Sequence, residues 1–191
     1  MSDTSSRQQL VAGAADMIRR RGLNATSIRE VAKHSGAPLG STYHHFPGGK
    51  DELAAEAVRH AATTTARALD AALETGPVDG LRSFFALWRD ILVRTDFHAG
   101  CPVLAVSVEE PQSGDEPTAA LRAAADAFEG WEHRLAASLR AHGTPEDRAA
   151  RRAALVVAAA EGAVAMSRAR RSTRPLDDVA AELTELVATG G

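Results

Sequence analysis

The stretch Thr26–His45, TSIREVAKHSGAPLGSTYHH, decides the fold because it encodes two short helices separated by a tight turn. Ser27 and Glu30 have the spacing of a capping box, in which each side chain satisfies an amide at the start of a helix. Gly36 interrupts the apolar pattern about two turns later. Pro38 suits the first position of the next helix, where an amide would have no partner.

A longer helix is predicted on each side of this pair. Apolar residues recur on one face of Arg7–Arg21, and Gly22 is suited to end that helix in the left-handed conformation. The segment Phe46–Gly49 interrupts the pattern, and Lys50–Glu74 carries a second long apolar stripe. The first three predicted helices match the helix-turn-helix, whose last helix enters the major groove of DNA.

The remainder of the chain is also helical in pattern, which predicts an all-α fold class. We expect an N-terminal three-helix helix-turn-helix DNA-binding domain over residues 1–50 and a C-terminal helical ligand-binding and dimerisation domain over residues 51–191. Periodicity does not assign residues 101–108, and we predict a helix there because no second strand is available for pairing. Residues 109–116 are predicted to be an exposed loop, with Glu109 and Glu110 in solvent.

Charge is unevenly distributed along the chain. The net charge is −3, yet residues 1–60 carry +2 and four histidines, which leaves −5 on the rest. A basic N-terminal segment followed by an acidic remainder fits a DNA-binding module joined to another kind of module. With no signal peptide, no apolar run of about 18 residues and one cysteine, Cys101, the expected location is the cytoplasm, away from the membrane.

About the first 55 residues resemble the TetR/AcrR family of regulators, and Phe46–Lys50 and Gly100–Val103 further resemble its LmrA/YxaF-like branch. The segments that carry the family resemblance are Ala14–Leu23, Thr26–Ala32, Ser35–Ala37, Gly40–Phe46 and Lys50–Leu53. The resemblance implies that Pro38–His45 is the recognition helix and that the C-terminal helices dimerise around a ligand pocket. One departure is Thr42, at a position that is more often leucine or isoleucine in the family.

The predicted DNA contacts combine this resemblance with residue chemistry. Small and hydroxyl side chains let a backbone approach bases and bond base edges or phosphates. The resemblance implies phosphate contacts from Tyr43, His44 and Lys50. The complete predicted DNA-binding set is Thr26, Ser27, Pro38, Leu39, Gly40, Ser41, Thr42, Tyr43, His44, His45 and Lys50.

An effector pocket and a dimer face are predicted in the C-terminal part. The candidates for a cavity that takes a flat or apolar molecule are Phe84, Trp88, Cys101, Leu104, Phe128, Trp131 and Met166, with ordinary core packing as the alternative. The last two helices are predicted to form the homodimer, the first through small and β-branched residues and the second through a leucine stripe, with an intramolecular helical hairpin as the alternative. On the first of these helices the residues are Ala149, Ala153, Val156, Val157, Ala160, Ala163 and Val164.

These observations predict a transcriptional regulator, most simply a repressor, whose homodimer binds a palindromic operator in double-stranded DNA and is released by a small apolar or aromatic effector. No catalytic residues, metal site or cofactor are expected. The adjacent His44 and His45 point about 100° apart on a helix and do not suit a shared metal. Two alternatives stay open: a helical small-molecule-binding protein without DNA binding, and an enzyme of unknown type.

Overall fold

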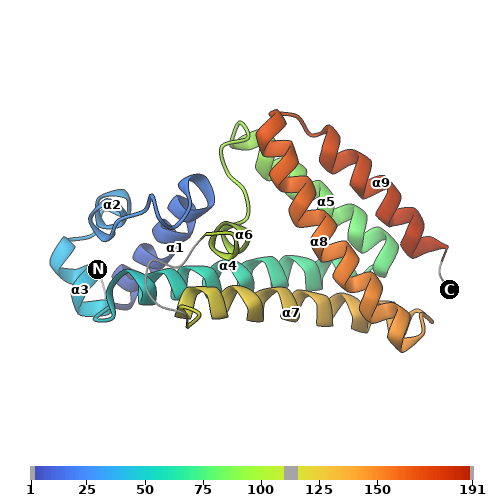
Figure 1. Cartoon of the computed structure of the whole chain (residues 1–191), viewed down its shortest axis with the longest axis horizontal. Coiled ribbons are helices and arrows are strands. Elements are labelled where there is room, and N and C mark those ends of the chain that lie inside the picture. Colours follow the sequence, from blue (N-terminus) through green and yellow to red (C-terminus); the bar gives the residue numbers. More distant parts are fainter. Residues whose placement is uncertain (1–2, 110–115, 190–191) are drawn as a thin grey trace. The chain divides into compact units, whose positions relative to one another are not determined.

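The computed structural model describes residues 3–109 and 116–189, which form nine α-helices and no β-strand (Figure 1). The helices are α1 (Asp3–Arg21), α2 (Ile28–His34), α3 (Leu39–His45), α4 (Gly49–Leu73), α5 (Pro77–Arg94), α6 (Pro102–Ser107), α7 (Ala119–Ala141), α8 (Glu146–Arg170) and α9 (Arg174–Ala188). The predicted all-α fold class is confirmed. Within the same two ranges, no helix is both long enough and apolar enough to cross a membrane.

The helices form two compact units. The first contains Met1–Thr63 and Cys101–Ala127, and the second contains Thr64–Gly100 and Phe128–Gly191. Helices α4 and α7 therefore contribute to both units. The predicted boundary between residues 50 and 51 falls near the start of α4, and as a division of function it stays a prediction.

The predicted capping box at the start of α2 is confirmed. The amide of Glu30 donates to Ser27 Oγ over 3.2 Å, and the amide of Ser27 donates to Glu30 Oε2 over 3.2 Å. Hydrogen bonds from the Ser27 hydroxyl and amide hold the pKa of Glu30 below its usual range. Because the folded chain favours the charged carboxylate, this stabilisation is present at neutral pH and is lost as the pH falls through the lowered pKa.

The sequence predicts proline at the first position of two helices, Pro38 in one and Pro145 in the other, and this prediction is wrong by one residue in both. Pro38 precedes α3 with φ −61° and ψ 136°, and Pro145 precedes α8 with φ −56° and ψ 147°. Both residues are extended and lie just outside the helix. The pyrrolidine ring fixes φ near a value that suits either position but leaves ψ open, so the sequence alone does not decide between them.

The segment that periodicity left unassigned forms α6, as predicted, and α6 packs against α1. The predicted loop over residues 109–116 lies mostly outside the described residues. The carboxylate of Asp51, on the first turn of α4, accepts hydrogen bonds from the amides of Ala119 and Ala120 over 3.2 and 3.4 Å. A carboxylate at this position satisfies amides that have no partner within α7.

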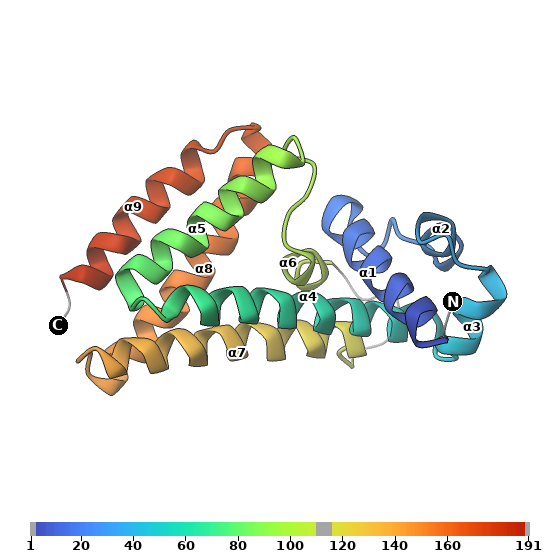
Figure 2. The same ribbon diagram turned by 180° about the vertical axis from the view of Figure 1, so that it is seen from behind.

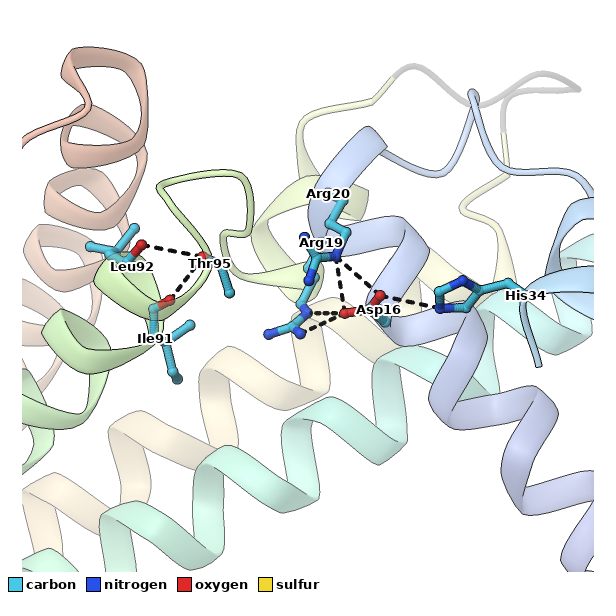
Figure 3. Close-up of polar contacts among 7 residues, drawn as sticks. All are labelled: Asp16, Arg19, Arg20, His34, Ile91, Leu92 and Thr95. Atoms are coloured by element: carbon cyan, nitrogen blue, oxygen red, sulfur yellow. Dashed lines mark hydrogen bonds and ion pairs between the residues drawn. The ribbon is translucent and has the colours of Figure 1, made fainter. Parts of the chain in front are cut away.

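Asp16 joins α1 to α2 through a small charged cluster (Figure 3). Its carboxylate accepts a hydrogen bond from Arg19 Nε over 2.8 Å and lies 3.2 Å from His34 Nε2. Partial burial raises the pKa of Asp16, but hydrogen bonds from Arg19 and Arg20 and their charges outweigh that effect and lower it. The cluster therefore holds a charged aspartate where the last turn of α1 meets the end of α2.

In the second unit α5, α8 and α9 lie side by side (Figures 1 and 2). The small residues predicted to line the dimer face of α8 instead form the core of this unit. Six of them are buried in the single chain, namely Ala149, Ala153, Val156, Ala160, Ala163 and Val164, whereas Val157 is half-buried. The intramolecular helical hairpin accounts for this face, because α8 packs against α9 and α5 of its own chain and these residues are buried in that chain.

Candidate nucleic-acid interface

Helix α3 presents a polar face to solvent. Tyr43 is 57% exposed, and Pro38, Gly40 and His44 are also exposed. Leu39, Ser41 and His45 are half-buried at the edges of this face. Seven of the predicted DNA contacts thus lie together on or beside one short helix.

Gly40 has no packing role within the described chain. A Cβ built on Gly40 meets no heavy atom within 4 Å, and its φ lies outside the left-handed region. Glycine inside a helix costs roughly 0.5–1 kcal/mol relative to alanine. The chain therefore carries a glycine in the first turn of its exposed helix without an internal packing reason for it.

Phe46 anchors the end of α3 beneath this face. Its side chain is 0% exposed, and the guanidinium carbon of Arg7 lies 5.2 Å from the ring centroid. Arg7 also forms an ion pair with Glu56 of α4 over 3.0 Å. The sequence pattern placed Phe46 in a helix stop and in the family resemblance but not in the core, although a lone large apolar residue after a polar helix is a signal for such an anchor.

Thr42 does not fit the predicted role of DNA contact, because it points into the core. Its side chain is 0% exposed, and its Oγ1 has no hydrogen-bond partner within the described residues. A buried hydroxyl without a partner costs free energy. We therefore reassign Thr42 to the packing of α3 against the rest of the unit.

Replacement of Thr42 by valine tests this correction. We expect Thr42→Val to raise the free energy of unfolding by about 1 kcal/mol or leave it unchanged, since a methyl group replaces an unpaired buried hydroxyl. Urea denaturation measures the stability, and operator affinity should stay within about twofold of the parent value. A tenfold loss of affinity in a stably folded variant would restore Thr42 to the contact set.

The residues before α2 also divide into buried and exposed members. Thr26 is 4% exposed, and its Oγ1 donates to the carbonyl of Gly22 over 2.7 Å, so its side chain belongs to the turn rather than to a DNA surface. Ser27 is exposed. Lys50 Nζ donates to the carbonyl of Asn24 over 3.4 Å, which places this cation beside the same turn.

The predicted effector residues fall in both units. Phe84 and Trp88 form an edge-on pair with centroids 6.4 Å apart, and Phe128 and Trp131 form another at 5.6 Å, all in the second unit. The other three candidates are Cys101, which is buried, Leu104, which is half-buried, and Met166, which is 46% exposed. A separate cavity of about 300 Å³ lies by the α4–α5 turn and the end of α9, and none of these candidates lines it.

Three helices at the start of the chain, with the third exposed on its polar face, define a helix-turn-helix DNA-binding protein. Residues 10–57 match the model of the bacterial regulatory proteins of the tetR family, and residues 77–182 match that of the LmrA/YxaF-like transcriptional regulator C-terminal domain. The chain belongs to the TetR family, in the branch of LmrA and YxaF. It is accordingly a DNA-binding transcriptional regulator and not an enzyme.

Similar proteins cover almost the whole chain. An HTH-type transcriptional regulator of Mycobacterium tuberculosis is 40% identical over 183 residues, which are 95% of this chain and 93% of the relative. The HTH-type transcriptional regulator LmrA of Bacillus subtilis is 29% identical and covers 98% of this chain and 99% of its own. The TetR regulatory protein of Rhodobacter sphaeroides shares the fold with a TM-score of 0.83, at 23% identity over 94% and 97% of the two chains.

Proposed function

We propose that this regulator is a cytoplasmic repressor, whose homodimer binds a palindromic operator and is released by a small apolar or aromatic effector. The observation that carries the DNA-binding part is the exposed face of α3, with Gly40 in its first turn. Gly40 allows the helix backbone to approach base edges closely, which offsets its cost to helix stability. Tyr43 and His44 flank it, and we propose that they contact phosphates.

The proposed dimer face lies on another edge of α8, about 120° around the helix from the buried alanines. Leu155 and Met166 are 49% and 46% exposed, and Gly162 lies between them with no heavy atom within 4 Å of a built Cβ. Large exposed apolar side chains beside a small residue favour close packing of two helices. We therefore assign Met166 to the dimer face instead of the effector pocket.

The two aromatic pairs are the basis of the proposed effector site. Trp88 and Trp131 are buried, while Phe84 and Phe128 are half-buried. Aromatic side chains provide large apolar area with defined geometry, which suits a flat apolar ligand. To release DNA, the effector must bind more tightly to a dimer whose DNA-binding helices are wrongly spaced for the operator than to the dimer that binds the operator.

The salt dependence of DNA binding tests the proposal. An operator is first selected from a random duplex library with the unaltered chain, and affinity is measured by fluorescence anisotropy at several salt concentrations. We expect Lys50→Ala to lower the slope of log K against log salt by about 0.9 for each bound protomer, with sequence preference retained. Loss of a phosphate contact has this signature because fewer counterions are released.

The control is Arg67→Ala, which removes one exposed cation from the second unit. This variant should keep the parent slope. An unchanged slope in Lys50→Ala would remove Lys50 from the phosphate contacts. If the unaltered chain selected no palindrome and retained DNA only without sequence preference, the operator proposal would fail and the ligand-binding alternative would gain support.

A further inference from the structure

The carboxylate of Glu109 binds the turn between α1 and α2. The amide of Leu23 donates to Glu109 Oε1 over 2.6 Å, and the amide of Asn24 donates to Oε2 over 2.6 Å. Glu109 follows α6, so these bonds join segments 86 and 85 residues apart in the sequence. The expectation that Glu109 is solvated is therefore wrong, since both its oxygens accept hydrogen bonds from the backbone.

Gly22 makes room for this contact. Its φ of +83° is one that glycine adopts readily, and a Cβ built on it would lie 2.2 Å from Glu109 Oε1. Gly22 thus ends α1 and also leaves the space that the carboxylate occupies. A larger residue at position 22 would strain the turn and displace Glu109.

The peptide groups of this turn are held by three side chains. Thr26 bonds the carbonyl of Gly22, Lys50 bonds the carbonyl of Asn24, and Glu109 binds two amides. Lys50 is proposed to bind DNA, whereas the Thr26 side chain belongs to the turn itself. Glu109 is the member that comes from the segment after α6, beyond the DNA-binding helices.

We propose that Glu109 is a positioning residue for DNA binding: it fixes the turn that sets where α2 begins and where Lys50 lies. This inference rests on the proposed operator binding. Hydrogen bonds to a charged acceptor are stronger than neutral ones, and a bidentate pair also fixes direction. Glu109 accepts a hydrogen bond from the amide of Asn24, and Lys50 donates one to the carbonyl of the same residue. Loss of the carboxylate therefore frees the backbone segment that positions Lys50.

Through this contact, the position of α6 can affect the turn between α1 and α2 within the first unit. Helix α6 packs against α1 and ends two residues before Glu109. A shift of α6 along α1 would withdraw the carboxylate from the turn.

The test compares Glu109→Ala and Glu109→Gln with a matched control, Asp126→Ala, which removes an exposed carboxylate from α7 in the same unit. Two quantities are measured on the full chain. Amide hydrogen exchange at Leu23 and Asn24 reports the contact itself, and fluorescence anisotropy reports affinity for the selected operator. The amides are observed by NMR in the absence of DNA.

We expect Glu109→Ala to raise exchange at these two amides by about tenfold or more and to weaken operator affinity by about 5- to 30-fold. Glu109→Gln keeps one acceptor oxygen, and its effects should be smaller in both measurements. Asp126→Ala should match the parent chain. If Glu109→Ala does not fold, the comparison of Glu109→Gln with the parent decides the outcome.

Two results would overturn the inference. Unchanged exchange would mean that the carboxylate does not hold the turn. Faster exchange with unchanged operator affinity would mean that the contact is structural and has no part in DNA binding. By contrast, failure of the unaltered chain to select any operator would overturn the proposed function itself, while the exchange data would still report on the contact.

Discussion

Replacement of Gly162 by arginine is expected to convert the dimer to a monomer and to weaken operator affinity by about 100-fold or more. The proposed dimer face brings two copies of α8 together where Gly162 leaves space beside Leu155 and Met166. A long charged side chain would prevent that approach and would be desolvated without a partner. In a dimer, binding of one DNA-binding domain holds the second domain close to its half-site. A monomer lacks this effect and therefore loses most of the affinity that the dimer has for the operator.

The measurement combines light scattering after size exclusion with fluorescence anisotropy on the selected operator. The matched control is Ala150→Arg, which places the same side chain at an exposed position of α8, about 120° around the helix from Gly162. This control should remain dimeric and bind DNA as the parent does. A dimeric Gly162→Arg variant with parent affinity would place the interface elsewhere.

Features that depend on neighbouring residues were predictable from the sequence. The capping box of Ser27 and Glu30 lies within four residues, so its pattern specifies the start of α2 without help from the rest of the fold. The end of α1 at Gly22 and the turns on either side of α3 also depend only on nearby residues. The all-α fold class follows from such signals because each helix carries its own apolar stripe and its own ends.

Features that depend on the tertiary fold were not predictable in this way. Thr42 has a side chain suited to DNA contact, and its burial is decided by how α3 packs. The alanines of α8 indicate close helix packing, but periodicity does not distinguish a neighbour in the same chain from one in a second copy. The contact of Glu109 with Leu23 and Asn24 leaves no local pattern at all, since the partners are more than 80 residues apart.

Truncation of Phe46 to alanine should selectively unfold the first unit. A fully buried phenylalanine contributes through its apolar surface and through the cavity that its loss creates, and removal costs about 3–5 kcal/mol. Phe46 is 0% exposed, and Arg7 would also lose the ring against which its guanidinium packs. A loss of this size is comparable to the whole stability of a small helical unit.

Two optical probes separate the units in a urea titration. Both tryptophans, Trp88 and Trp131, belong to the second unit, whereas circular dichroism reports the helices of both. In Phe46→Ala the loss of helix should therefore begin at a lower urea concentration than the change in tryptophan fluorescence, and operator binding should disappear. Phe46→Leu should cost less than about 1.5 kcal/mol, because it keeps most of the buried volume. Coincident transitions of Phe46→Ala at the parent midpoint would show that α3 does not depend on this anchor, and the exposed face around Gly40 would then need another source of rigidity.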